Sequence, residues 1–335
     1  MLFRQILLLC LLGASNAMAA QPPLVKPWEH FVERQNADLA LAGRIWSVRT
    51  GKFISPAVLA DQLAGAHYVF LGETHDNRDH HRLQAWVISQ IARRGRKPAV
   101  VMEMVDSSQA KALAAYQAKK GHDAAGLGAA IGWKASGWPD WSMYQPIAEA
   151  AFAAGLKLYA ANYPRTFIRK VGMKGLGILE DDRRKALLLD KRLPEVMEAD
   201  LRKMIVKSHC NLLPAAATGP MVNVQRLRDA AFADAMLRDG AKTGAIMITG
   251  GEHARTDRGA PWYLARRSKN APLSSLVMVE VRPENKDVAD YEPKSPDGQF
   301  AADYLWFTPM AKRPDPCEGL KRHLMKKREK MKKTK

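Results

Sequence analysis

Short runs that are apolar throughout recur along the chain, separated by longer stretches in which apolar residues follow helical spacing. The runs lie at about 67–71, 98–104, 156–164, 244–253 and 274–281. Runs of this length are typical of strands buried on both faces of a parallel sheet. Strands separated by helices predict a mainly parallel sheet that is covered on both sides. We therefore expect an α/β fold, a three-layer α/β/α sandwich.

Two helix starts are marked by residues that favour the first turn of a helix. Ser55-Pro56 predicts one start, and Asp76 or Asn77 can cap a second helix at about 78–94. The inner side of the first helix is expected to carry Val58, Leu59, Gln62 and Leu63, and that of the second Leu83, Val87, Ile88 and Ile91. Both helices would cover the sheet.

The chain between 165 and about 240 has several helical patterns and no good strand. We expect a helical lobe there, inserted into the sheet topology. Before the first long strand, Thr50-Gly51 separates two short strand-like runs, which indicates a hairpin. The run at 274–281 is expected to be the last strand.

Acidic, imidazole and amide side chains follow four of the predicted strands. They are Glu73 and His75, then Glu103, then Asn162 with Arg165, and finally Glu252 with His253. Groups just past the carboxyl ends of strands in an open α/β sheet face a shared crevice. Helix capping explains any one of these strand ends equally well. Four such strand ends together are harder to explain by capping, because desolvating several acids costs free energy unless the acids face a cation or hydrogen-bond donors.

The two ends of the chain differ from its body. Residues 1–20 combine Arg4, an apolar run at 6–12 and the small residues Ala17 and Ala19, which is typical of an export signal. We therefore expect an exported, periplasmic protein whose single domain spans 21–320. The remaining 321–335 form a basic tail that we expect to be disordered.

The net charge of +18 is partly located in the tail, which holds +8 of it. A run of like charges is usually solvated, and in an exported protein it meets anionic lipid before nucleic acid. We expect contact with a membrane surface, or an unbound tail, and no specific nucleic-acid partner.

Two cysteines remain after removal of the signal, Cys210 and Cys317. An oxidising compartment permits one disulfide between them, which is the simplest account. The alternatives are two buried thiols, or a reactive Cys210 beside His209.

Several motifs match a known family in collinear order. They are Gly72-Glu73-Thr74-His75-Asp76-Asn77, Glu103-Met104, Trp138-Pro139 before Tyr144, Ala161-Asn162, His209-Cys210, Gln225-Arg226-x-Arg228-Asp229 and Gly251-Glu252-His253-Ala254-Arg255 with the residues up to Leu264. Over about 45–310 the chain resembles the ChaN-like haem-binding uptake family of the Tiki superfamily, which is related to the erythromycin esterases. Family members usually have Gly where this chain has Glu252.

The resemblance implies a helical lobe over the strand ends and haem, or another tetrapyrrole, as ligand in iron uptake. The candidate axial ligands are His75, His209, His253, Tyr144 and Tyr163, and Arg165 or Arg255 would meet the propionates. The cofactor-binding set is Glu73, His75, Glu103, Asn162, Arg165, His209, Glu252, His253 and Arg255. The oligomeric state is left open, a homodimer included.

The alternative function is hydrolysis by the same strand-end groups. Glu73, His75, Glu103 and His253 could activate water with an imidazole as general base. Alternatively Glu73, His75 and His253 could hold a divalent metal such as zinc. A third interpretation is that the polar cluster only holds the helical lobe in place.

Overall fold

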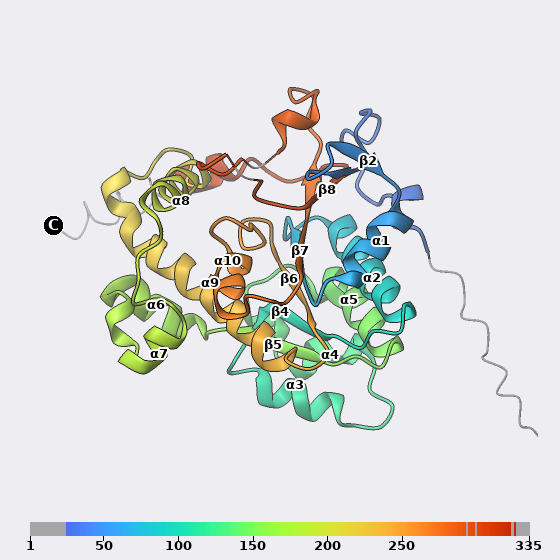
Figure 1. The fold of residues 1–335 in the computed structure, drawn as a ribbon, viewed down its shortest axis with the longest axis horizontal. Helices are drawn as coiled ribbons and strands as arrows, with labels where there is room; N and C mark the ends of the chain where they lie inside the picture. Colours follow the sequence, from blue (N-terminus) through green and yellow to red (C-terminus); the bar gives the residue numbers. More distant parts are fainter. Residues whose placement is uncertain (1–24, 293, 299, 323–324, 326–335) are drawn as a thin grey trace, which may run out of the picture.

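The computed structural model describes residues 25–292, 294–298, 300–322 and 325. In this part of the chain eight strands form one sheet in the order β2-β1-β8-β7-β3-β6-β4-β5 (Figure 1). Their bounds are β1 Ile45–Ser47, β2 Lys52–Ile54, β3 Tyr68–Glu73, β4 Ala99–Asp106, β5 Leu158–Asn162, β6 Ala245–Gly250, β7 Leu273–Glu280 and β8 Tyr304–Thr308. The six strands from β8 to β5 are parallel, and the β1–β2 hairpin is added antiparallel to β8.

Helices cover both faces of the sheet, which confirms the three-layer α/β/α fold (Figure 1). Helices α1, α2, α4 and α5 pack on one face, and α9 and α10 on the other. The bounds are α1 Pro56–Gly65, α2 Arg78–Arg93, α3 Ala110–Gln117, α4 Ala124–Ala130, α5 Trp141–Ala153, α6 Arg165–Lys174, α7 Asp181–Ala186, α8 Glu195–Ser208, α9 Gly219–Asp239 and α10 Ala260–Arg267.

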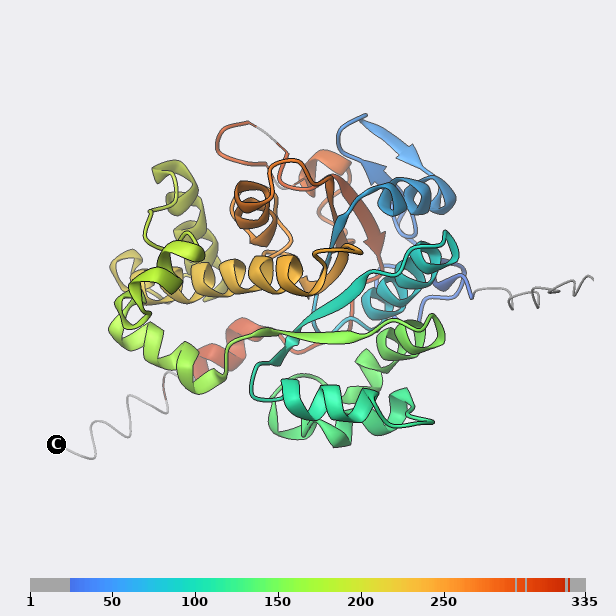
Figure 2. The same ribbon diagram turned by 60° about the horizontal axis from the view of Figure 1, so that its bottom comes forward.

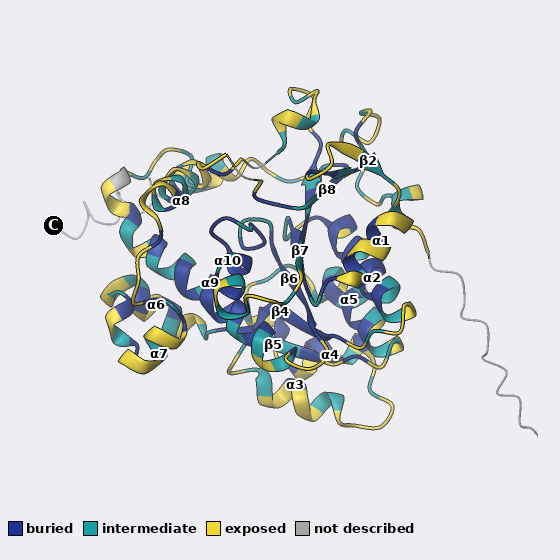
Figure 3. Ribbon diagram, in the orientation of Figure 1, coloured by how far each residue is buried: buried dark blue, intermediate teal, exposed yellow. Residues whose placement is uncertain are grey.

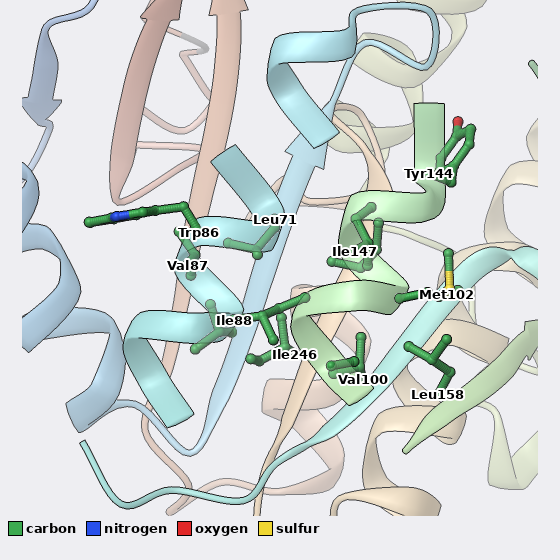
Figure 4. Close-up of a cluster of buried hydrophobic side chains, with 14 of the residues drawn as sticks. Leu71, Trp86, Val87, Ile88, Val100, Met102, Tyr144, Ile147, Leu158 and Ile246 are labelled. Carbon is green, nitrogen blue, oxygen red and sulfur yellow. The ribbon is translucent and has the colours of Figure 1, made fainter. Parts of the chain in front are cut away.

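Strand β3 lies near the middle of the sheet between β7 and β6, and all six of its residues are buried. Val69 and Leu71 point into the core under α2 and α5, where Figure 4 shows Leu71 next to Trp86 and Val87. Phe70 points into the core on the opposite face. The continuous apolar run is therefore explained by burial on both faces.

Helix α2 begins where the sequence predicts and has the predicted inner face. The side chain of Asn77 accepts hydrogen bonds from the backbone N–H of Asp79 and His80, so Asn77 is the cap. Helix α1 is capped by Ser55 as expected, but its face is rotated: Leu59, Ala60 and Leu63 are buried. Val58 and Gln62 are exposed, because α1 presents only a narrow side to α2.

The predicted lobe consists of α6, α7, α8 and the first half of α9, which extend beyond the sheet as Figure 2 shows. Its outer surface is mostly exposed (Figure 3). A disulfide joins Cys210, just after α8, to Cys317, which lies 107 residues further along the chain. The lobe is therefore covalently linked to the C-terminal segment.

The strand at 273–280 is not the last, contrary to the sequence-based expectation. Strand β8 follows and lies inside the sheet, parallel to β7 and antiparallel to β1. Leu305, Trp306 and Phe307 are buried. The five-residue run follows about twenty mostly polar residues with no helical pattern. The sequence therefore predicts no crossover helix before it.

Strand β5 forms one edge of the sheet, and side chains cover its outer side. Gln117 of α3 donates to the carbonyl oxygen of Leu158 at 3.0 Å and accepts from its N–H at 2.8 Å. Arg238 of α9 lies 3.5 Å from the carbonyl oxygen of Ala160. These contacts occupy the groups that a neighbouring strand would use.

Across the described residues, none of the helices is both long and apolar enough to cross a membrane. The predicted export signal at 1–20 lies outside the described residues, as does most of the basic tail at 321–335.

Candidate functional site

Glu73 ends β3 and connects three aromatic side chains from three elements. Its Oε1 lies 2.8 Å from Nδ1 of His75, and its Oε2 lies 2.9 Å from Nε2 of His81. The phenol of Tyr144 donates to Oε1 at 3.2 Å and stacks on His81 at 4.1 Å. The carboxylate is thus fully buried: Oε1 has two hydrogen-bonding partners, whereas Oε2 lies at ion-pair distance from His81 without hydrogen-bond geometry.

These contacts set the protonation of the cluster. Burial alone would raise the pKa of Glu73, but His81 and His75 outweigh burial and hold it well below its usual range. Burial likewise opposes a charge on His75, yet the hydrogen bond that His75 donates to Glu73 and the charge of Glu103 raise the pKa of His75 to about 9. At neutral pH His75 is therefore an imidazolium.

The turn after β3 is fixed by a neutral histidine. The N–H of Thr74 donates to Nδ1 of His80 at 2.8 Å, and Nε2 of His80 lies 2.8 Å from the hydroxyl of Thr308 on β8. Burial dominates here and lowers the pKa of His80 to about 3. His80 therefore holds the turn in place and does not line the cavity described below.

Glu103 reaches the site because β4 leaves its regular pairing. The register with β6 ends at Met102, and pairing with β5 resumes only at Asp106. The Glu103 carboxylate accepts hydrogen bonds from the hydroxyl of Thr249 at 2.6 Å and the N–H of Gly250 at 2.9 Å. Burial opposes its charge, but His253 and His75 outweigh it and lower the pKa of Glu103.

His253 lies between two acids on different elements. Its Nδ1 is 2.6 Å from Asp229 of α9, and its Nε2 is 3.5 Å from Glu103. The side-chain amide of Gln225 also lies 3.1 Å from Nδ1. Burial disfavours a charged ring, but the two carboxylates raise the pKa of His253. Both ring nitrogens are therefore engaged.

A cavity of about 530 Å³ opens over the ends of β3 and β6, and we call it the strand-end cavity. Its floor consists of polar groups and glycines, and its other walls come from the lobe helices. The lining residues are Glu73, Thr74, His75, Gly172, Met204, Ile205, Ser208, His209, Pro220, Met221, Val224, Gln225, Gly250, Gly251, Glu252 and His253. Apolar lobe side chains facing a few convergent polar groups are typical of a cofactor site.

Gly250 allows His75 to lie over the sheet. A Cβ atom at this position would be 3.0 Å from Nε2 of His75, closer than side chains normally approach. Trp138 packs edge-on against the same imidazole at 4.8 Å. Trp138 therefore contacts the site, whereas its neighbours Trp133 and Trp141 donate to the backbone carbonyl oxygens of Pro139 and Ala124 and hold this part of the chain in place.

Four other predicted site residues make structural contacts. The amide of Asn162 donates to the carbonyl oxygen of Glu103, and Arg165 donates to that of Ser136. Arg255 is buried and paired with Asp257 at 2.6 Å. Glu252 lines the strand-end cavity, but its carboxylate is paired with Arg258 at 2.7 Å.

Of the remaining candidates for the haem ligand, one lines the strand-end cavity and two lie outside it. His209 lines the strand-end cavity from the end of α8. Tyr163 lies outside it, and its phenol accepts from Arg183 at 3.3 Å. Tyr144 is fully buried, and burial next to Glu73 raises its pKa well above the usual range.

A family model described as haem-binding uptake, Tiki superfamily, ChaN matches residues 59–264. The chain belongs to this family. The matched segment runs from α1 to α10 and includes every residue around the strand-end cavity. No match was found among curated proteins.

Three solved structures match this ChaN-like chain. ChaN of Campylobacter jejuni, described with cofacial haem binding, has a TM-score of 0.59 at 19% identity and covers 78% of this chain and 95% of its own. The type III effector HopBA1 and a mutant of the erythromycin esterase EreC in its open conformation both have TM-scores of 0.42, at 10% and 13% identity. The match to HopBA1 covers 75% of this chain and 91% of the effector. The match to the esterase covers 78% of this chain and 95% of the esterase.

Within the described part of this ChaN-like chain, no group of three or more His, Cys, Asp or Glu side chains is arranged to hold a metal ion. In the alternative set Glu73, His75 and His253, the carboxylate and Nδ1 of His75 already bind each other. Of the atoms that zinc would need, Nδ1 of His75 and both ring nitrogens of His253 lie against carboxylates.

Sequence reasoning missed the contributions of His81, Asp229 and Arg228. His81 follows Glu73 by eight residues at a helix start, where polar residues are ordinary. Asp229 and Arg228 occur within a long helical pattern, and the only signal for them was the motif shared with the ChaN-like family. Their roles depend on α9 crossing the strand ends, which local spacing does not reveal.

Proposed function

We propose that this protein binds haem, or a closely related tetrapyrrole, in the strand-end cavity. Family membership supports the ligand class, and the cavity supports the place. Met204, Ile205, Met221 and Val224 offer an apolar wall opposite the imidazoles. A flat macrocycle with a metal centre needs both kinds of surface.

The observation that carries the proposal is that Nε2 of His209 has no hydrogen-bond partner among the residues that the structure describes. Its Nδ1 lies 2.8 Å from the carbonyl oxygen of Ile205, which can only accept, so Nδ1 holds the proton. Nε2 is then left with a lone pair, which is the form in which imidazole binds a metal. His209 is therefore our choice for the axial ligand.

The other candidates are less suited to this role. His253 has both nitrogens engaged by acids, and Tyr144 and Tyr163 lie outside the cavity wall. His75 lines the cavity, but with a pKa raised to about 9 it must release a proton before it can ligate. His75 instead supplies a positive charge at the floor of the cavity.

We also propose that the protein is exported and serves iron uptake. The Cys210–Cys317 disulfide supports an oxidising compartment, since such links are rare in the cytosol. A test is to express the full chain with an epitope tag and to compare the periplasmic and cytosolic fractions.

Haem binding is tested by titrating the apoprotein with hemin and following the Soret band. We expect a saturable shift that His209→Ala weakens by at least about tenfold, in keeping with the loss of an axial ligand. The matched control is His122→Ala, because His122 also bonds a backbone carbonyl oxygen through Nδ1 but lies far from the cavity. Equal hemin affinity in both variants would reject His209 as ligand, and absence of any saturable shift would reject the function.

The hydrolytic alternative requires an imidazole that accepts a proton. With its pKa raised to about 9, His75 already carries one at neutral pH, and His253 is held between Asp229 and Glu103. At neutral pH His75 is therefore not available as a general base, and Nε2 of His253 lies 3.5 Å from Glu103. The geometry therefore supports binding better than hydrolysis.

A further inference from the structure

A second cavity of about 560 Å³ lies beside the first, over the ends of β4 and β5, and we call it the arginine cavity. Glu103 is on its floor, and His253, which lines the strand-end cavity, lies 3.5 Å from Glu103. Trp138 and Tyr163 form aromatic walls. The two cavities are thus neighbours with different linings.

Arg228 of α9 lines the arginine cavity without a partner of its own. Among the residues that the structure describes, it forms no hydrogen bond or ion pair, and its Nε atom is fully buried and unsatisfied. Leaving a charged donor unsatisfied costs several times the worth of an ordinary hydrogen bond. A ligand that accepted from Arg228 would recover this free energy.

Two more positive features converge on the same cavity. The guanidinium of Arg165 contacts only the carbonyl oxygen of Ser136 among described partners, and no acid. Helix α6 begins at Arg165 with Pro164 as its cap residue, so no side chain accepts from its first N–H groups. Pro164, Arg165 and Thr166 all line the cavity, and the positive end of the helix dipole therefore faces it.

Among the described residues, the acids of this cavity form no ion pair with the arginines. Glu103 is bound by Thr249, Gly250 and His253, and Asp106 accepts from the N–H and hydroxyl of Ser108 at 2.8 and 2.5 Å. Both carboxylates are thus engaged elsewhere. The guanidinium groups of Arg165 and Arg228 remain available.

We propose that the arginine cavity is an oxyanion-binding site that takes a carboxylate or phosphate group through Arg228 and Arg165. Guanidinium groups bind such anions with two parallel hydrogen bonds, and Trp138 offers a flat surface to the rest of the ligand. The anion can belong to a free small molecule or to a propionate of a tetrapyrrole in the neighbouring cavity.

The test is calorimetric titration of the apoprotein with inorganic phosphate and with succinate, in a low-chloride buffer. We expect saturable binding that Arg228→Gln and Arg165→Gln each weaken about tenfold or more, the loss of a hydrogen bond to a charged group. Arg169→Gln is the matched control, since Arg169 lies on α6 but outside the cavity, and thermal unfolding verifies that the variants fold. Equal affinities in all three variants, or no saturable binding of either anion, would overturn the proposal.

A second titration distinguishes the two sources of the anion. If the anion is a free molecule, phosphate still binds to haem-loaded protein and Arg228→Gln leaves hemin affinity unchanged. If it is a propionate, haem loading abolishes phosphate binding and Arg228→Gln weakens hemin binding. Because the first titration uses apoprotein, its failure and a failure of haem binding are separate results.

Discussion

Glu73 is the residue on which the charges at the end of β3 depend. It faces two imidazoles, His75 and His81, and a phenol, and it is fully buried. The net stabilisation that such a buried carboxylate gives the fold is small. Removing the carboxylate or one of its partners, however, strongly destabilises the fold, because the remaining group is left buried and unpaired. The state of His75 follows from that of Glu73.

Replacing Glu73 by Gln tests this dependence. The pKa of His75 should fall from about 9 toward its ordinary value, because its largest favourable contact is the one with Glu73. The free energy of unfolding should fall by about 3 kcal/mol, as for a broken buried pair. Histidine NMR titration and urea unfolding measure the two effects.

The control is Glu252→Gln, whose carboxylate is 46% exposed and pairs with Arg258. It should cost less than about 1 kcal/mol. A His75 titration that is unchanged in the Glu73→Gln variant would contradict this account of the site.

His80 predicts how stability depends on pH. Its pKa is lowered to about 3 in the folded protein, whereas the unfolded chain takes up the proton near pH 6.5. Its contribution is therefore complete above pH 6.5 and is lost as the pH falls toward 3. From pH 6.5 to 4.5 this loss is about 2 kcal/mol.

The measurement is urea unfolding at both pH values, for the native chain and for His80→Gln. The variant should lose about 2 kcal/mol less than the native chain between them, since it has no imidazole to protonate. Equal losses would show that His80 is protonated in the folded state.

For single residues, the sequence predicted most members of the polar cluster but not the residues that bind them from behind. Glu73, His75, Glu103 and His253 are brought together because each lies in or just after a strand of one parallel sheet. Asp229, which binds His253, is on a helix whose path over the sheet has no local signature. Such partners come from tertiary packing and need the structure.

Among the elements, the turn after β6 constrains β3 most closely. A Cβ on Gly72 would lie 2.9 Å from Cβ of Ala254 and 3.0 Å from Cα of Gly251. The strand and the following turn therefore approach through a position without a side chain. The two strand ends that carry His75 and His253 are kept adjacent in this way.

Gly72→Ala should lower the free energy of unfolding by about 1–3 kcal/mol, because backbone must move to admit the methyl group. Gly65→Ala is the control: it lies at the end of α1 with no atom within 4 Å of the added Cβ. That change should be neutral or stabilising by up to about 1 kcal/mol. Equal destabilisation in urea would disprove the close-approach argument.

The elements with strong periodicity were predictable, and those defined by their neighbours were not. Helix α2 and strands β3, β4 and β6 lie where apolar runs and the Asn77 cap place them. Strand β8 escaped prediction because its pairing with β7 and β1 is set by distant residues. The rotation of α1 has the same origin, since its buried side depends on where α2 lies.

For the whole molecule, the disulfide connects the lobe to the far end of the chain. Removing it by Cys210→Ser with Cys317→Ser should lower the free energy of unfolding by about 2–5 kcal/mol, because the unfolded chain regains a closed loop of more than a hundred residues. Cys210 directly follows His209, so hemin affinity should also fall. Thermal unfolding and hemin titration, each with and without reductant, measure both effects.

Reductant should affect the native protein and leave the double variant unchanged. A native protein whose unfolding and hemin affinity are insensitive to complete reduction would show that the lobe holds its position without the link. Either single Ser variant leaves a free thiol and is less suitable as a control.

The covering of β5 affects how copies of the chain can associate. Gln117 occupies both outward backbone groups of Leu158, and Arg238 lies at the next outward carbonyl oxygen. A second chain that approached this edge would find its first pairing positions taken, so the sheet cannot serve as a template for fibrillar growth there. A substitution at Gln117 would expose the outward N–H and carbonyl oxygen of Leu158 and reopen that part of the edge to pairing.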